Sequence, residues 1–259
     1  MIERIKENWE YRDMILSLTR RELRGRYQGS ALGFLWAFLS PLCQIIVYSV
    51  VFSLIARNNL EKFYIYVITG MIPWFFFDNS VRHGSICIRR EGDLVKKIYF
   101  PHEVLPIAIV TSDFINMLLC FVIVFIAIAV SGVHVSAAGL FCLPLIMLIE
   151  YTICLGCALM VSAITVYVKD MEHIVQVLLM PAIYVTPLLY TLDQMPRKAV
   201  ILLKLNPMTY VAECYHAILY WGTTPYLSYV LRAGAFAVAI LIIGELIFMK
   251  LDANFAEEF

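Results

Sequence analysis

The charged and nucleophilic residues of this sequence do not form a recognisable catalytic or metal-binding motif. The glycine-rich loop G-x-x-x-x-G-K-[ST], whose backbone amides cradle nucleotide phosphates, does not occur in the chain. The five histidines show neither H-E-x-x-H nor another metal-binding spacing. We therefore expect no enzymatic activity, no metal and no cofactor in this chain. If ATP drives its function, a partner must bind the ATP and Mg²⁺.

The cysteines are interpreted as small hydrophobic residues. Their number, seven, is odd, and most of them lie within apolar runs without the spacing of a disulfide framework. Cys154 and Cys157 share the C-x-x-C spacing of redox sites, but a lipid-length apolar run surrounds them. A redox function is not expected.

One strongly charged segment, residues 85–105, interrupts the apolar chain. Its sequence is SICIRREGDLVKKIYFPHEVL, with paired cations at Arg89–Arg90 and Lys96–Lys97. Apolar runs long enough to cross a bilayer flank it on both sides, so this charged segment must lie in water at a membrane face. We interpret it as a surface that docks on an ATPase carried by another polypeptide.

Five acidic residues lie in or near the apolar runs: Asp78, Asp113, Glu150, Glu213 and Glu245. An ionised group at the bilayer centre costs about 2.5–3.5 kcal/mol on insertion scales, so these side chains must face protein or water. One alternative is the proton site of a cation-coupled carrier, and another is a hydrophilic conduit. Polar packing between helices, or a position near the membrane interface, is the interpretation that we favour, because no partner recurs at helical spacing to form a proton relay.

The composition identifies the elements that must position these residues. Of 259 residues, 61% are hydrophobic and only 15% are charged, whereas about 25% are charged in a soluble domain. An all-α polytopic membrane protein is expected. Runs of about 20 apolar residues can cross the hydrocarbon core, and they predict six spans at 31–56, 63–81, 104–130, 140–168, 174–190 and 229–250.

The segment 191–225 differs from these spans. It is partly apolar but is broken by Pro196, Pro207, Gly222 and Pro225. Irregular backbone survives at membrane depth only where protein or a water-filled cavity satisfies its amides. We predict a re-entrant pair of short helices in this segment, before the last span.

The distribution of basic residues predicts the topology. Lys and Arg concentrate before the first span and in segment 85–105, which places these regions and both chain ends in the cytoplasm. Residues 1–30 are charged and carry no cleavable signal sequence. They predict a helix that lies along the cytoplasmic interface, although a simple positive anchor would give a similar pattern.

Local patterns then resemble the permease subunits of ABC-2 type polysaccharide exporters, which export O-antigen, capsule or teichoic acid. The patterns occur in order over essentially the whole chain: R26-Y-x-x-S-x-L-G-x-x-W-x(4)-P41, G70-x-x-P-W-F-F-F77, K97-I98 with E103-V-L-P106, T186-P-L-x-Y190 and N206-P-M208. One departure is Lys169-Asp170, where the family commonly has Arg-Asp. Lysine keeps the charge but lacks the bidentate geometry of arginine.

The resemblance implies a single transmembrane domain, 1–259, in a homodimer with two ATP-binding subunits. It also implies residence in the bacterial inner membrane, contact with membrane lipid and no nucleic acid partner. The exported substrate would be a polysaccharide linked to undecaprenyl diphosphate, with O-antigen as the first choice. The alternatives are an ABC-2 exporter of a drug or lipid and, from another class, an ion-coupled carrier.

The resemblance also assigns expected roles to residues. For ATPase coupling these are Arg89, Arg90, Glu91, Gly92, Asp93, Leu94, Lys96, Lys97, Lys169 and Asp170. For the substrate pathway they are Arg20, Arg24, Arg26, Trp36, Phe38, Tyr48, Tyr184 and Tyr190, the arginines being suited to the carrier's diphosphate. For an outer gate they are Asn206, Pro207, Tyr210 and Glu213.

Overall fold

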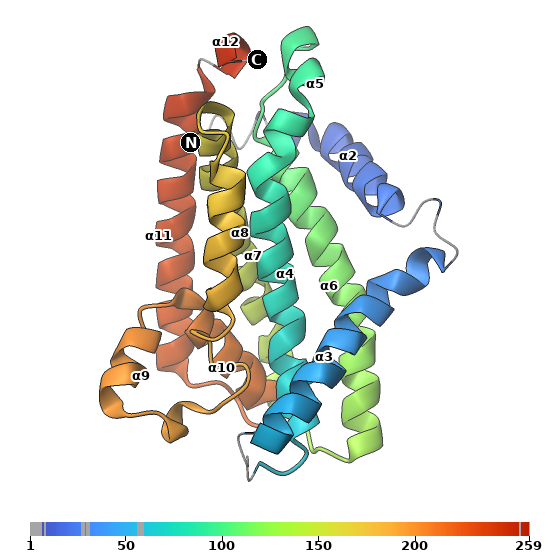
Figure 1. The fold of residues 1–259 in the computed structure, drawn as a ribbon, viewed down its shortest axis with the longest axis vertical. Coiled ribbons are helices and arrows are strands. Elements are labelled where there is room, and N and C mark those ends of the chain that lie inside the picture. Colours follow the sequence, from blue (N-terminus) through green and yellow to red (C-terminus); the bar gives the residue numbers. More distant parts are fainter. Residues whose placement is uncertain are drawn as a thin grey trace.

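The computed structural model describes residues 7, 9–26, 29, 32–55, 60–253 and 255–258. All regular secondary structure in these ranges is helical, which confirms the predicted all-α polytopic architecture (Figure 1). The helices are α2 (Arg12–Gly25), η1 (Gly33–Leu35), α3 (Trp36–Ile55), α4 (Phe63–Arg90), α5 (Gly92–Lys97), α6 (Val104–Ser131), α7 (Ala137–Tyr167), α8 (Met171–Ala182), η2 (Leu192–Gln194), α9 (Arg197–Leu203), α10 (Pro207–Leu219), α11 (Leu227–Asp252) and α12 (Phe255–Glu258).

Four described helical runs are long and apolar enough to cross a membrane. They are Gly33–Leu54, Val104–Ser131, Ala137–Tyr167 and Leu227–Asp252. They agree with the first, third, fourth and sixth predicted spans to within a few residues at the ends that the structure describes. Residues 31 and 56 of the first predicted span lie outside the described residues, as do residues 1–6, 8, 27, 28 and 30 of the predicted interface segment.

The second predicted span forms a longer helix than expected. α4 runs without interruption over 28 residues, so residues 85–90 of the charged segment continue the helix. Its second half carries Asp78, Asn79 and Arg82, which make it less apolar than the four spans above. The helix ends only at Glu91, whose backbone leaves the helical region immediately before α5.

The fifth predicted span, 174–190, is helical only in its first half. α8 ends at Ala182, and the chain then forms turns to residue 190. Pro187 explains the change, because it lacks an amide hydrogen and disfavours helical geometry at the preceding residue. The buried Tyr66 hydroxyl donates to the carbonyls of Pro187 and Tyr190, at 3.2 and 2.9 Å, and so satisfies part of the irregular backbone.

The helices pack most closely where glycines meet. A Cβ atom at Gly244 of α11 would lie 2.2 Å from the carbonyl oxygen of Gly156 on α7, so neither backbone leaves room for a side chain. Small residues permit this approach between membrane helices. α4 approaches α7 in the same way, because a Cβ atom at Gly84 would lie 2.7 Å from the Cβ of Ala158.

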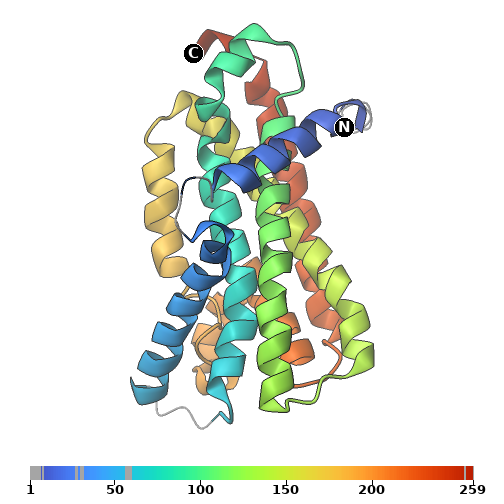
Figure 2. The same cartoon turned by 90° about the vertical axis from the view of Figure 1, so that its right-hand side faces the viewer.

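Two groups of short helices lie at opposite ends of the bundle. α5 and α12 lie at one end, and α9 and α10 lie at the other (Figure 1). α2 crosses the outside of α6 near the α5 end (Figure 2). Its Leu18 is buried, and its Thr19 hydroxyl donates to the Ala108 carbonyl at 3.3 Å. The structure therefore places the charged segment and the proline-rich segment 191–225 far apart.

Candidate functional site

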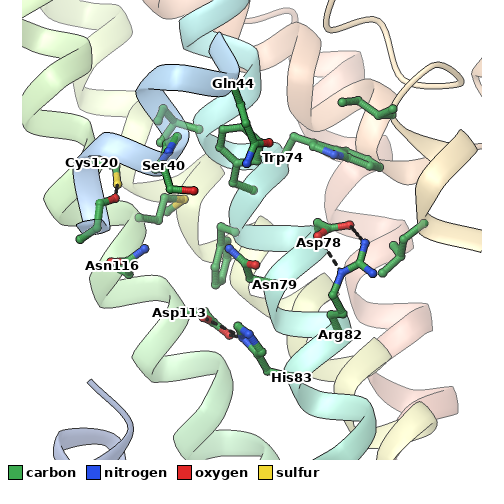
Figure 3. Close-up of a pocket in the computed structure, with 18 of the residues that line it drawn as sticks. Ser40, Gln44, Trp74, Asp78, Asn79, Arg82, His83, Asp113, Asn116 and Cys120 are labelled. Carbon is green, nitrogen blue, oxygen red and sulfur yellow. Dashed lines mark hydrogen bonds and ion pairs between the residues drawn. The ribbon is translucent and has the colours of Figure 1, made fainter. Parts of the chain in front are cut away.

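A cavity of about 510 Å³ lies among α3, α4, α6 and α8 (Figure 3). Its volume falls within the roughly 300–1,000 Å³ of small-molecule sites, but its lining is unusually polar for the interior of a membrane protein. The polar lining residues are Arg26, Ser40, Gln44, Asp78, Asn79, Arg82, His83, Asp113 and Asn116.

Helical spacing brings these polar groups together. Ser40 and Gln44 are four residues apart on α3, and Asp113 and Asn116 are three apart on α6. Such positions share one face of a helix. The polar residues of α4 occupy two adjacent stripes, at positions 78, 79, 82 and 83. Figure 3 shows side chains from α3, α4 and α6 directed toward one space.

The charges inside the cavity are paired with one another. Arg82 donates to both carboxylate oxygens of Asp78, through Nε at 3.1 Å and Nη2 at 2.9 Å. Arg26 pairs with Asp113, and His83 Nδ1 lies 3.2 Å from the Oδ2 atom of Asp113. The side chain of Asp113 is only 1% exposed. An unpaired charge is strongly disfavoured at this depth, so pairing is what allows these residues to lie there.

Aromatic side chains form the remaining walls. They include Trp36 and Tyr48 of α3 and Trp74 and Phe75 of α4. Trp74 is almost completely buried, whereas Trp36 is exposed. Aromatic rings provide flat apolar surface with little conformational freedom to lose, and Tyr and Trp add a polar atom. The cavity thus combines amides, paired charges and aromatic faces.

The structure brings together only part of the predicted substrate pathway. Arg26, Trp36 and Tyr48 line the cavity. Phe38 instead contacts Phe34 edge to face, with ring centroids 5.3 Å apart. Tyr190 donates to the carbonyl of Tyr184 at 3.0 Å, and both lie outside this lining.

The other two predicted arginines lie on the surface of α2. Arg20 and Arg24 are exposed and border a shallow polar groove with Asp13 and Ser17. They differ from Arg26, whose guanidinium is held by Asp113. The three arginines therefore belong to two different environments.

Sequence reasoning missed most of the cavity. Ser40, Gln44, Asn79, Arg82 and His83 were given no site role, nor were Trp74 and Asn116. The available signal was polar residues repeating at helical spacing on otherwise apolar helices.

The acidic residues of the apolar runs have separate surroundings. Asp78 and Asp113 line the cavity, in agreement with the conduit alternative. Glu150 is fully buried and accepts a hydrogen bond of 2.6 Å from the Tyr215 hydroxyl, which is polar packing between helices. Glu245 borders an apolar groove between α2 and α11. The acidic residues of the apolar runs therefore lie in different surroundings.

The predicted coupling residues surround the end of α4. Asp93, Lys96 and Lys97 are exposed on α5. Gly92 is buried and Leu94 is half-buried, while Arg89 lies half-buried at the end of α4. Lys169 and Asp170 are exposed in the connection between α7 and α8.

The end of α4 is joined to α2 by crossed ion pairs. Arg21 Nη2 lies 2.6 Å from Glu91 Oε1, and Arg90 pairs with Glu22. The connection between α5 and α6 is also anchored. Its His102 Nδ1 lies 2.7 Å from Asp252 Oδ1, beside the buried ring of Phe255. Segment 85–105 is thus fixed to both terminal regions.

The predicted gate residues begin and line α10. Asn206 caps this helix, because its Oδ1 accepts from the Met208 amide at 3.0 Å, and Pro207 occupies the first turn. The Asn206 amide also donates to the Thr186 hydroxyl at 2.9 Å. Tyr210 is buried, with the Arg232 guanidinium 5.9 Å from its ring.

Glu213 lies half-buried on the same helix, outside the predicted spans. Burial raises the pKa of its carboxyl to about 7; nearby Asp193 also raises it, and Lys204 lowers it.

Comparison with known proteins gives consistent matches. The family model described as ABC-2 type transporter matches residues 14–220. The chain is 33% identical to the O-antigen export system permease protein RfbA of Myxococcus xanthus, over 99% of each chain. It is 27% identical to the protein of the same name from Klebsiella pneumoniae, over 95% of this chain and 94% of the other. It is 23% identical to the polysialic acid transport protein KpsM of Escherichia coli, over 76% and 77%.

Proposed function

Because this chain belongs to the ABC-2 type transporter family, we propose that it exports a lipid-linked O-antigen polysaccharide across the bacterial inner membrane. It is a transport subunit, and ATP hydrolysis belongs to a separate subunit. The observation that carries the proposal is its similarity over 99% of its length to an O-antigen export permease. The polar cavity supports it independently.

The cavity chemistry favours a glycan over a drug or a lipid. A sugar carries many hydroxyl groups, and each loses water when it enters the membrane protein, so each needs a new partner. The side-chain amides of Gln44, Asn79 and Asn116 can each donate and accept hydrogen bonds. A pathway for an apolar drug would gain nothing from these groups.

We infer a complex of two copies of this chain with two ATP-binding subunits. α3 supports a second copy, because its apolar side chains Ile46, Val47, Val50 and Leu54 are exposed in the single chain. An interface between α3 of one copy and α3 of the other would join the two cavities into one conduit. In this arrangement both chain ends lie in the cytoplasm.

The carrier's diphosphate is proposed to bind at α2. Arg20 and Arg24 present their guanidinium groups to solvent at the membrane face, and guanidinium groups bind phosphate oxygens in bidentate fashion. Arg26 can take part only if the diphosphate displaces Asp113 from it.

The proposed coupling runs through a single continuous helix. The exposed side chains of α5 and the Lys169–Asp170 connection would contact the ATPase. Movement there reaches the cavity directly, because α4 carries both Arg89 at its cytoplasmic end and Asp78 and Arg82 at the cavity. α9 and α10, at the opposite end of the bundle, would form the outer gate, where Asn206 fixes the start of α10.

The proposal is tested by reconstituting the chain with its cognate ATPase in proteoliposomes. Undecaprenyl-diphosphate-linked O-antigen is expected to stimulate ATP hydrolysis, while the carrier without glycan stimulates it less. An apolar drug or a phospholipid that stimulates hydrolysis equally well would support the drug or lipid alternative instead. Transport by the chain without any ATPase would establish an ion-coupled carrier.

A further inference from the structure

The arginine and carboxylate charges that line the cavity cancel one another. The pair Asp78–Arg82 contributes no net charge, and Arg26 with Asp113 contributes none either. From this balance we propose that the cavity accepts uncharged sugar segments and discriminates against polyanionic glycans. The inference rests on the proposed function and specifies its substrate class.

Each described arginine of the lining, and His83, already faces a side-chain carboxylate. Arg82 uses Nε and Nη2 on Asp78. Arg26 and His83 both face the same carboxylate of Asp113. A sugar carboxylate or phosphate would meet arginines whose charge these side-chain carboxylates already balance. It would therefore add an uncompensated negative charge to the cavity, which is unfavourable away from bulk water.

An uncharged sugar meets no such obstacle. Its hydroxyls can exchange water for the amides of Gln44 and Asn79, which Figure 3 shows directed into the cavity. Its C–H faces can lie against the exposed ring of Trp36. These contacts do not require either ion pair to open. The same groups serve every uncharged unit of a long polymer.

The arginines proposed to bind the carrier's diphosphate lie outside the cavity. Arg20 and Arg24 are exposed on α2, in a groove that shares none of its residues with the cavity lining. The diphosphate of the carrier and the sugars of the glycan therefore have chemically different sites. The groove lined by Arg20 and Arg24 would bind negatively charged groups, whereas the cavity would disfavour them.

The test compares two glycans on the same undecaprenyl-diphosphate carrier. A neutral polymannose chain and a polysialic acid chain of equal length are given to the chain reconstituted with its cognate ATPase. Stimulation of ATP hydrolysis by the neutral glycan is expected to exceed that by the anionic one by about tenfold, since an anionic sugar would add an uncompensated charge to the charge-balanced cavity. Equal stimulation would overturn the inference alone. If neither glycan stimulated ATP hydrolysis, the proposed function itself would be overturned.

Two variants of one ion pair control for loss of structure. Asp78→Asn leaves the cavity with a surplus cation and is expected to reduce the discrimination by about fivefold. Arg82→Gln leaves a surplus anion and is expected to increase it. Glu61→Gln removes one exposed carboxylate far from the cavity lining and is expected to leave the ratio unchanged. The inference would be contradicted if Asp78→Asn and Arg82→Gln changed the ratio of stimulation by the two glycans in the same direction. A general loss of structure would affect both variants alike, whereas a charge effect must be opposite in the two.

Discussion

Arg21 of α2 donates to Glu91, 2.6 Å away, at the break between α4 and α5. The adjacent pair Glu22–Arg90 has the opposite polarity. The two pairs join the N-terminal helix to the end of the helix that carries the cavity residues. A force applied at α5 is therefore shared between α4 and α2.

Reversing the charge of Glu91 is expected to uncouple ATP hydrolysis from export. Glu91→Lys places a third cation beside Arg21 and Arg90 and separates α2 from α4. Exposed pairs contribute only about 0.2–1 kcal/mol, so folding is retained. The measurement is glycan exported per ATP hydrolysed.

The double variant Arg21→Glu/Glu91→Lys restores the pair with reversed polarity and is expected to regain much of the coupling. Asp93→Lys serves as a comparison, because Asp93 is exposed on α5 and its charge reversal is expected to disturb the proposed ATPase contact directly. Adding Arg21→Glu to Asp93→Lys should not restore the glycan exported per ATP hydrolysed. Failure of the double variant to improve on Glu91→Lys would show that the ion pair does not transmit the coupling.

Charge reversal on α2 tests carrier docking. Arg24→Glu and Arg20→Glu are expected to abolish export while membrane insertion and ATPase assembly continue, since both side chains are exposed and form no part of the core. Export is measured as surface O-antigen, and assembly by co-purification of the ATPase. Normal surface O-antigen in both variants would refute the proposed diphosphate site.

Helix packing at paired glycines is expected to be sensitive to a single methyl group. A Cβ atom at position 156 would lie 2.7 Å from the Leu241 backbone, so Gly156→Ala is expected to destabilise the chain by about 1–3 kcal/mol. Gly234 lies in α11, the helix that carries Leu241. A methyl group added at Gly234 would have nothing within 4 Å. Gly234→Ala is expected to be neutral or stabilising by about 0.5–1 kcal/mol. Thermal unfolding in detergent compares the two, and equal effects would contradict the packing.

Stability at the α10 end is expected to depend on pH. Burial raises the pKa of Glu213 to about 7, from a usual value of 4.5. The protonated carboxyl is therefore favoured in the folded chain. Its contribution to stability is fully present below the pKa of the unfolded chain and is lost as pH rises through the folded pKa of about 7. The unfolding temperature of the native chain should fall over this range relative to Glu213→Gln, which stays neutral. Parallel profiles would show that Glu213 does not titrate there.

Sequence patterns located most of the helices because long apolar runs have few alternatives in a membrane. The irregular segment 191–225 was also recognisable from its prolines. The end of α8 at Ala182 was harder to predict, because the apolar run continues to residue 190 while Pro187 stops the helix. Likewise, segment 85–105 was interpreted as one docking surface outside the spans, yet residues 85–90 continue α4.

The cavity was not predictable as a unit, because its residues come from helices that meet only in three dimensions. Asp78 and Arg82 are four residues apart and could have been paired from the sequence. Arg26 and Asp113 are separated by 87 residues, and no local pattern joins them. The pairing also changes how Arg26 is interpreted, from a free phosphate ligand to one partner of a buried ion pair.

The central claim is that this chain, together with its ATPase, moves a lipid-linked O-antigen across the membrane. The most direct measurement is ATP-dependent transfer of undecaprenyl-diphosphate-linked O-antigen between the two leaflets of proteoliposomes, scored by access of an added lectin. The account predicts transfer only when the chain, the ATPase and ATP are all present. Transfer that is independent of ATP, or absence of transfer by an assembled and ATP-hydrolysing complex, would contradict it.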